Sequence, residues 1–322
     1  MIAAAHPTPP PPTRGPLAGH LRMVVQHVHG SPRFAVAGEG MRVRGIVLPY
    51  VPGQTVRVRF YRDGRRVQTR TARVAPVGNG AGEFHVDYTS PSPGVVWARG
   101  EHARSTHEGA FSAKSAEVRY VSARMSIGAS GPSVGLLQSE LAGLHYVVPR
   151  GGVFDEGTAR AVIAYRKVAG LARVPETDAG LFRALQRGSG AFHVRYARDG
   201  RHVEADLTRQ VLAEVEPHGR VRAIYTMSSG KPSTPTVTGS FTVYEKTPGV
   251  NQKGMVDSNY FIRGYAIHGY AEVPTYAASH GCLRVPIPDA PAIFSWVGIG
   301  TRVDVYDEGG GGSHNVSGNA GP

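Results

Sequence analysis

The only cysteine of this 322-residue chain, Cys282, lies in the run Ser279-His280-Gly281-Cys282-Leu283-Arg284, and His268 precedes it by 14 positions. A thiol attacks as its thiolate, and a histidine within hydrogen-bond reach can remove the proton near neutral pH. A residue adjacent to a cysteine seldom points toward it, whereas a loop of a dozen residues can bring a histidine back. We therefore expect Cys282 to be a nucleophile and His268, rather than His280, to be its base.

The glycine before the cysteine predicts a second part of such a site. Gly281 can adopt backbone angles that other residues avoid, and we expect it to aim its own amide and that of Cys282 at one point. Two converging amides make an oxyanion hole, in which the loss of one donor typically costs about 2.7–4 kcal/mol. A nucleophile, a base and an oxyanion hole together indicate acyl transfer.

Two other interpretations of these residues stay open at this point. Cys282 could be a small buried hydrophobic residue whose neighbouring histidines are solvated. A zinc site could form from His268, His280 and Cys282, although no second cysteine or nearby carboxylate supplies an obvious fourth ligand.

The residues around Cys282 and His268 resemble the signature of the L,D-transpeptidases, whose catalytic domain is of the YkuD type. The similarity continues upstream in Ser228-Ser229-Gly230, which resembles the Ser-x-Gly turn of that family. Thr234-Pro235 and Thr238-Gly239-Ser240-Phe241 resemble its Thr-Pro-x-Gly-x-Phe segment, with two or three residues inserted. The resemblance spans the chain from near Ala191 to Asp307.

This resemblance implies a cysteine acyltransferase that acts on peptidoglycan stem peptides. Cys282 would attack the carbonyl of the third residue of a donor tetrapeptide and expel the terminal D-alanine. The side-chain amine of an acceptor stem would resolve the thioester and form a 3→3 cross-link. His280 would line the site and help to hold the thiolate or the oxyanion loop. The resemblance implies no metal, nucleotide or organic cofactor.

The family pattern also suggests roles for the remaining residues near the motif. The group that orients the base in this family follows the histidine, and here it is Gly269, which offers only its carbonyl. Ser279 is expected to brace the loop, or else to be a surface turn residue. Arg284 could pin a carboxylate or brace the loop. Tyr260 and Tyr265 could line a peptide groove, or could be ordinary packing residues of short strands.

We expect a multidomain, mainly β chain with a small α domain. The segments are a disordered stretch at 1–22, an Ig-like β-sandwich at 23–122, a three-helix domain at 125–188, the catalytic domain at 190–307 and a flexible tail at 308–322. Within the catalytic domain, the span from Glu245 to Asn259 contains Pro248, Gly249 and Gly254 and predicts a mobile flap over the site.

Alternating residues predict the β-sandwich. Thr55–Phe60 and Val67–Thr71 flank an Asp63-Gly64 turn, which is a hairpin signal. Runs of this kind add up to about the seven strands of an Ig-like module. Gly82-Glu83-Phe84-His85-Val86 also resembles bacterial Ig-like modules.

Between Ser126 and Arg187 the apolar period becomes helical. We expect one helix behind a Ser133 cap, a second behind an Asp155 cap and a third after Thr177. The set resembles the peptidoglycan-binding-like module of wall enzymes, but it departs from that pattern at Asp155 and at Tyr165-Arg166. A helical spacer is the alternative interpretation.

The net charge of +12 and the pI near 10.0 predict attraction to a polyanion. The cations are spread along all segments rather than gathered in a basic helix or interleaved with stacking aromatics, which argues against nucleic acid. Glycan, an anionic wall polymer or a membrane surface would fit.

No apolar run is long enough to span a membrane, and the N-terminus lacks the apolar centre of a signal peptide. An extracytoplasmic location, at the cell wall or on the periplasmic side, is therefore implied by the resemblance alone. We expect a monomer. Two alternative functions remain: an L,D-carboxypeptidase, in which water replaces the acceptor amine, and a catalytically silent wall-binding adaptor.

Overall fold

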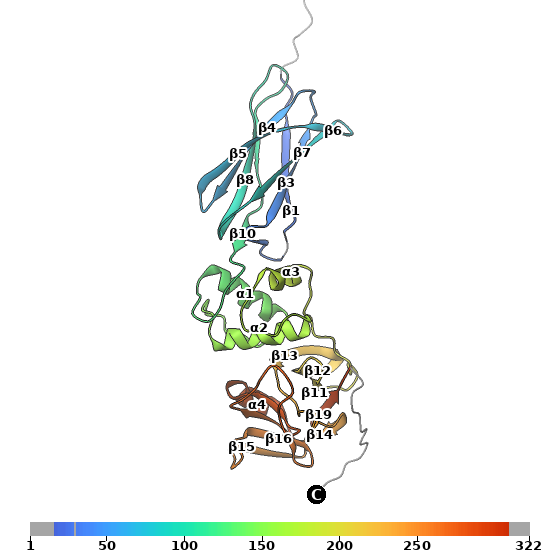
Figure 1. Ribbon diagram of the computed structural model, residues 1–322. Coiled ribbons are helices and arrows are strands. Elements are labelled where there is room, and N and C mark those ends of the chain that lie inside the picture. Colours follow the sequence, from blue (N-terminus) through green and yellow to red (C-terminus); the bar gives the residue numbers. More distant parts are fainter. Residues whose placement is uncertain (1–15, 29, 309–322) are drawn as a thin grey trace, which may run out of the picture. The chain divides into compact units, whose positions relative to one another are not determined.

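The computed structural model describes residues 16–28 and 30–308, which divide into two compact units after Ser122 (Figure 1). Most of the segment expected to be disordered, and most of the expected tail, lie outside the described residues. The expected limit at residue 22 is wrong, because the first strand already begins at His20. The fold is multidomain and mainly β, as predicted.

The first unit consists of two sheets that share one hydrophobic core. One sheet has the order β1-β3-β7-β6, with β1 at His20–Gln26, β3 at Gly40–Leu48, β7 at Ala81–Thr89 and β6 at Ala75–Gly78. The other has the order β2-β10-β8-β4-β5 with β9 paired to β8, and comprises β2 at Phe34–Val36, β10 at Val118–Val121, β8 at Gly94–His102, β4 at Thr55–Arg62, β5 at Arg65–Arg73 and β9 at Phe111–Lys114.

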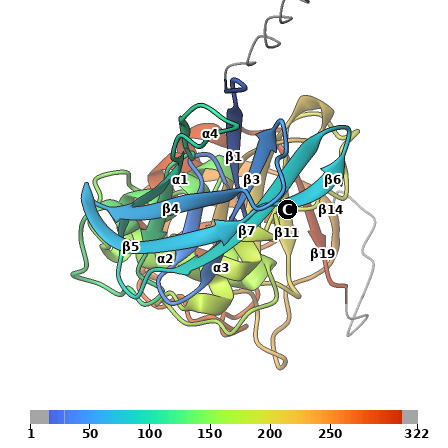
Figure 2. The same ribbon diagram turned by 90° about the horizontal axis from the view of Figure 1, so that it is seen from above.

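Aromatic rings join the two sheets across this core. Phe60 stacks on Tyr88 with ring centroids 4.6 Å apart, and Tyr120 meets Tyr88 edge-on at 6.3 Å. The described part of this unit has ten strands rather than about seven. The predicted hairpin is confirmed: β4 and β5 lie side by side (Figure 2), and Asp63 and Gly64 between them have φ angles of 49° and 77°. These positive angles are those that a tight hairpin turn requires.

Three helices open the second unit: α1 at Pro132–Gly143, α2 at Glu156–Val168 and α3 at Ala179–Gln186. The Asp155 cap is confirmed, because its Oδ1 accepts a hydrogen bond from the Thr158 amide at 2.8 Å. The Ser133 cap is wrong. The helix begins one residue earlier, at Pro132, whose fixed φ suits the first helical position, and its N-cap is Gly131.

Two further sheets follow. The five-stranded sheet β13-β12-β11-β19-β14 comprises β11 at His202–Asp206, β12 at Val211–Glu216, β13 at Arg220–Thr226, β14 at Gly239–Thr242 and β19 at Arg302–Tyr306. The four-stranded sheet β15-β16-β17-β18 comprises β15 at Glu245–Val250, β16 at Val256–Ile262, β17 at Tyr265–Tyr270 and β18 at Leu283–Pro286. A short 3₁₀ turn, Ile287–Asp289, leads into α4 at Ala290–Trp296.

The core of this unit contains side chains of both sheets and of α4, among them the fully buried Leu212, Met227, Ile267 and Leu283. The expected flap is the hairpin of β15 and β16, which is part of the second sheet. The helices pack directly on the first sheet, with α2 against β12 and β13, and the Ile224 amide of β13 donates to His145 O at 2.9 Å. None of the described helices is both long and apolar enough to cross a membrane.

Candidate active site

Parallel pairing of β17 with β18 positions the two residues singled out by the sequence. Ile267 pairs with Leu283 and both point into the core, so the next pair, His268 and Arg284, points to the opposite face of the sheet. Cys282 immediately precedes β18. The fold therefore brings the cysteine to the start of the strand that pairs with the strand of the histidine.

The resting sulfur contacts the start of β17 rather than the imidazole. Cys282 is half-buried, and its Sγ is 3.7 Å from Gly264 O. Gly264 immediately precedes β17 and lies four residues before His268 in the chain. No hydrogen bond joins the thiol and the imidazole in the described structure, so a rotation of the Cys282 side chain must precede proton transfer. Such contacts often tighten only when substrate binds.

His268 is buried, with 3% of its surface exposed, and its orientation is fixed by the main chain. Its Nδ1 lies 2.9 Å from Gly269 O, so Nδ1 carries a proton and Nε2 is left to accept one. A side chain at Gly269 would place its Cβ 2.8 Å from that of Ala290, which explains why only a carbonyl can serve here. The orienting group is thus the one implied by the family pattern.

Burial shifts the pKa values of both His268 and Cys282. It lowers the pKa of His268, and the nearby Arg284 guanidinium lowers it further. Burial also raises the pKa of the Cys282 thiol, although the Ala266 amide, Arg284 and Lys253 favour the thiolate. Both shifts favour the neutral thiol and the neutral imidazole over the thiolate–imidazolium pair.

The loop that carries Cys282 is held by its own serine. Ser279 is fully buried, its Oγ donates to Cys282 O at 2.6 Å, and the Gly281 amide donates to the same Oγ at 3.0 Å. Gly281 has a φ of +117°, and an added Cβ would lie 1.9 Å from a ring carbon of Tyr265. The expected two-amide oxyanion hole is thus only half available, because the Gly281 amide is already bonded and the Cys282 amide remains as donor.

Comparison with known proteins agrees with this geometry. A profile of the L,D-transpeptidase catalytic domain matches residues 200–305. The solved L,D-transpeptidase of Xylanimonas cellulosilytica is 34% identical over 56% of this chain and 97% of its own, with a TM-score of 0.51. The chain belongs to the L,D-transpeptidase family. An L,D-transpeptidase of Stackebrandtia nassauensis is 22% identical over 56% of this chain and 94% of its own, with a TM-score of 0.37. A comparison with curated proteins gave no match.

A second segment of this L,D-transpeptidase holds the catalytic loop from outside. The amides and carbonyls of Ser228 and Arg284 bond to each other at 2.9 Å in both directions. Ser229 O accepts from the amide of Ser279 at 2.9 Å, and Thr236 Oγ1 donates to Gly281 O at 2.8 Å. Sequence reasoning recognised the Ser228–Gly230 turn as part of the family signature but missed that it braces the loop.

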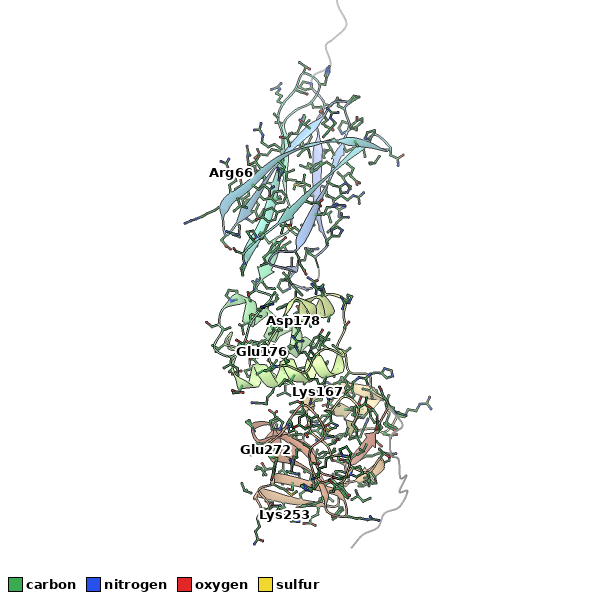
Figure 3. The ribbon with its side chains drawn as sticks, in the orientation of Figure 1. Arg66, Lys167, Glu176, Asp178, Lys253 and Glu272 are labelled. Carbon is green, nitrogen blue, oxygen red and sulfur yellow. The ribbon has the colours of Figure 1, made fainter. Side chains whose placement is uncertain are left out.

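A buried lysine of the helical region anchors this bracing segment. Lys167 of α2 is labelled in Figure 3. Its Nζ donates to Gln210 O at 2.9 Å, Thr226 Oγ1 at 2.7 Å and Met227 O at 2.9 Å. The Gln210 side chain in turn accepts from the Ser229 amide at 2.8 Å. Burial lowers the pKa of Lys167 to about 7, while the two carbonyls and the hydroxyl around Nζ give hydrogen-bond partners to all three hydrogens of the ammonium form.

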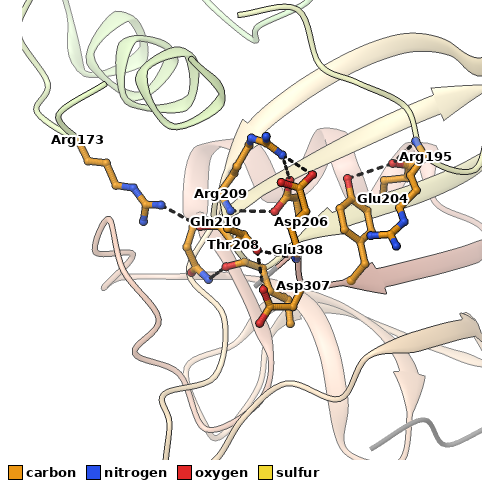
Figure 4. A network of polar contacts seen from close by, with 11 residues as sticks. Arg173, Arg195, Glu204, Asp206, Thr208, Arg209, Gln210, Asp307 and Glu308 are labelled. Carbon is orange, nitrogen blue, oxygen red and sulfur yellow. Dashed lines mark hydrogen bonds and ion pairs between the residues drawn. The ribbon is translucent and has the colours of Figure 1, made fainter. Parts of the chain in front are cut away.

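Arg173 extends the contact between the helical region and the sheets. It donates to Thr208 O at 2.9 Å and to Thr275 O at 2.7 Å, beside the polar network around Asp206 and Arg209 (Figure 4). Thr275 lies in the segment that leads from His268 to the catalytic loop. The helical region therefore contacts both segments that flank the site.

The other residues named from the sequence lie in different places. His280 is exposed, and its Nε2 lies 3.3 Å from Lys231 Nζ, so its ring contacts a lysine rather than the sulfur. The Arg284 guanidinium lies 4.1 Å from the ring centroid of Tyr270, near the buried imidazole. Tyr265 packs on Gly281, whereas the Tyr260 hydroxyl accepts from Asn251 at 3.4 Å within the β15–β16 hairpin.

The zinc interpretation receives no support from the geometry. Among the described residues, no three His, Cys, Asp or Glu side chains gather in an arrangement that could hold a metal ion. His280 is directed to Lys231, which is a poor neighbour for a metal ligand.

Proposed function

We propose that this L,D-transpeptidase forms 3→3 cross-links between peptidoglycan stem peptides through a thioester on Cys282. The observation that supports this most is the buried, neutral His268, whose Nδ1 is held by Gly269 O and whose strand pairs with the strand that follows the only cysteine. With the proton on Nδ1, the imidazole has Nε2 free, and Nε2 can accept the proton of a thiol.

In the proposed reaction, Cys282 Sγ attacks the carbonyl of the third residue of a donor tetrapeptide while its proton passes to His268 Nε2. The Cys282 amide donates to the oxyanion. When the peptide bond breaks, His268 returns the proton to the departing D-alanine amine. The side-chain amine of an acceptor stem then attacks the thioester, gives up a proton to His268 and forms the new amide, which restores the thiol.

Intact-protein mass spectrometry with a stem tetrapeptide tests this proposal. We expect an adduct on Cys282 with the mass of the donor minus D-alanine, and none in Cys282→Ala of unchanged circular dichroism. With an acceptor stem present, a 3→3 dimer supports transpeptidation. Release of tripeptide alone would make the protein an L,D-carboxypeptidase. A folded protein that forms neither adduct nor product would be a wall-binding adaptor.

The location and the partners belong to the same proposal. Stem peptides occur in the wall, so the protein would act on the extracytoplasmic side as a monomer. The domain limits at 125–188 and 190–307 remain predictions, as does glycan binding by the helical region. Three helices are present there, but the part of α2 that contains Lys167 and Arg166 is buried in structural contacts.

A further inference from the structure

The positive charge of the chain is concentrated in the first unit. Residues 1–122 contain 16 of the 36 lysines and arginines but only 7 of the 24 acidic residues, so they carry +9 of the net +12. The cations themselves are spread along all segments, as expected, and the excess in this unit arises because it has few acidic residues. The sandwich must therefore display much of this charge on its surface.

The arginines on the two outer faces of the sandwich have different charged neighbours. On the β3–β7 face, Arg42 pairs with Asp87 at 2.7 Å, and Arg44 bonds to Glu83 on the neighbouring strand. Hydrogen bonds from these arginines hold the pKa of both carboxyls below their usual values. Each arginine of β3 is thus matched by an acid across the strands.

On the opposite face, cations stand next to cations. Arg59 of β4 lies directly across from Arg99 of β8, and Arg99 lies directly across from Lys114 of β9. Like charges at directly opposed positions destabilise a sheet. Glu101 bonds to Arg59 and Arg99, and Glu117 bonds to Lys114 at 3.0 Å, which offsets part of this repulsion.

Further arginines extend the row toward the edge of the sheet. Arg57 is exposed two residues before Arg59 on the same face of β4, and it lies opposite Thr71 of β5. Arg66 and Arg73 are exposed on β5, and Arg66 projects from this edge strand (Figure 3). Glu101 of β8 lies directly across from Arg57, but among the described residues Arg57, Arg66 and Arg73 form no ion pair, so this face keeps an excess of cations.

The aromatic residues on this face narrow the choice of partner. Tyr61 stacks on Trp97 with centroids 4.2 Å apart and an interplanar angle of 9°, and Lys114 Nζ lies 4.5 Å from the Trp97 centroid. Two groups this close to one centroid must lie on opposite sides of the indole. Proteins that bind single-stranded nucleic acid offer open aromatic faces to the bases, and Trp97 has both faces covered.

We propose that this basic face, defined as Arg57, Arg59, Arg66, Arg73, Arg99 and Lys114, binds a linear phosphodiester polymer that carries no bases. Guanidinium groups match phosphate oxygens in geometry as well as charge. Alternate residues of a strand lie about 7 Å apart and neighbouring strands about 4.8 Å apart, so the cations form a two-dimensional array against which an extended chain of phosphates can lie. The proposal goes beyond cross-linking and does not depend on Cys282.

Binding of poly(glycerol phosphate) to the full chain tests this inference. We expect saturable binding at 150 mM salt that weakens with added salt, since each phosphate contact releases counterions. The triple variant Arg57→Gln, Arg99→Gln, Lys114→Gln should lose at least about tenfold in affinity. The slope of log K against log salt should fall by about 2, because three contacts at about 0.7 each are lost.

A variant of equal charge on the other face is the matched control. Arg22→Gln, Arg42→Gln, Arg44→Gln removes the same three charges from the same unit and should leave the affinity within about twofold. Equal weakening by both triple variants would overturn the assignment to this face, because only net charge would then matter. Absence of binding to the parent chain at 150 mM salt would overturn it as well.

Two further readouts separate this proposal from folding defects, nucleic-acid binding and catalysis. The chain has two tryptophans, so Trp296→Phe leaves Trp97 as the only indole, and its fluorescence should change on addition of polymer. Single-stranded poly(A) of equal charge should bind more weakly, and tighter binding would identify a nucleic-acid surface instead. The triple variant should still acylate Cys282 at the parent rate, whatever its affinity for the polymer.

Discussion

One lysine from each unit shows how differently the same residue type can be placed. Lys167 is 2% exposed and bonded to three acceptors next to the catalytic loop, while Lys114 is about half exposed above an indole. The buried lysine fixes the geometry of neighbouring segments. The exposed one adds to a field that reaches into solvent. In the second unit a lysine therefore holds neighbouring segments in place, whereas in the first unit a lysine adds to the positive charge that would attract a polyanion.

The largest effect is expected at the two histidines of the second unit. His268→Ala should slow acylation of Cys282 by about 10²–10⁴-fold, because no other group can take the thiol proton. His280→Ala should cost less than about tenfold, because its exposed ring contacts Lys231. Stopped-flow acylation by a carbapenem would compare them. Equal losses would mean that His280 turns to the sulfur when substrate binds.

Glycines with positive φ give the next largest contrast between the units. Gly281→Ala should slow acylation by about 10²-fold, because its Cβ would collide with Tyr265 and displace the nucleophile. Gly64→Ala also has a positive φ, but an added Cβ would meet nothing within 4 Å, so it should only lower stability by about 1 kcal/mol. Acylation kinetics and thermal melts of both variants would check this. A fully active Gly281→Ala would contradict the proposed tight loop.

The buried and exposed lysines provide the third comparison. Lys167→Met should destabilise the second unit by about 1–3 kcal/mol, because it leaves buried acceptors without a donor. It should also slow acylation by about tenfold, since the Ser228–Gly230 brace loses its anchor. Lys114→Met should change stability by less than about 0.5 kcal/mol.

Each unit contains one tryptophan, which allows the two lysine variants to be measured separately. In a Trp97→Phe background, urea unfolding followed by Trp296 fluorescence reports the second unit, and in a Trp296→Phe background Trp97 reports the first. If Lys167→Met is as stable and as active as the parent chain, the lysine does not position the loop.

The smallest effect concerns pH and the field of Arg284. Burial raises the pKa of the thiol and lowers that of His268, so alkylation by iodoacetamide should rise with pH to beyond the usual thiol range. The acid limb of acylation should lie below the usual imidazole value of about 6.5.

Arg284→Met should slow alkylation near pH 8 by about two- to fivefold, because a cation that favours the thiolate is lost. Arg263→Met, at the exposed β16–β17 turn, is the control, and an equal loss there would contradict the assignment to Arg284.

Local features of the chain were predictable where a few adjacent residues decide the outcome. The Asp63-Gly64 turn and the Asp155 cap both follow from short-range preferences of the backbone. The motif around Cys282 and His268 identified the family for the same reason, since its residues lie close together in sequence. The Ser133 cap failed because Pro132 fits the first helical position and moved the start of the helix.

Other features depend on pairings between distant segments. Nothing near Lys167 in the chain indicates that it meets Thr226, 59 residues later, or that it anchors a brace for the catalytic loop. The Gly281 amide donates to Ser279 Oγ and is therefore not free to donate to an oxyanion. This bond depends on the exact path of a loop that is held by the segment 228–236.

By itself, the sequence determined which residues could react and which faces of the strands are apolar, because residue type and period are properties of the chain alone. Only the tertiary structure decided the resting charge state of Cys282 and His268, through burial, and the alignment of Arg59, Arg99 and Lys114, through strand register. Both depend on which distant segments pack together, and in a long chain packing is settled by the whole core rather than by neighbours in sequence.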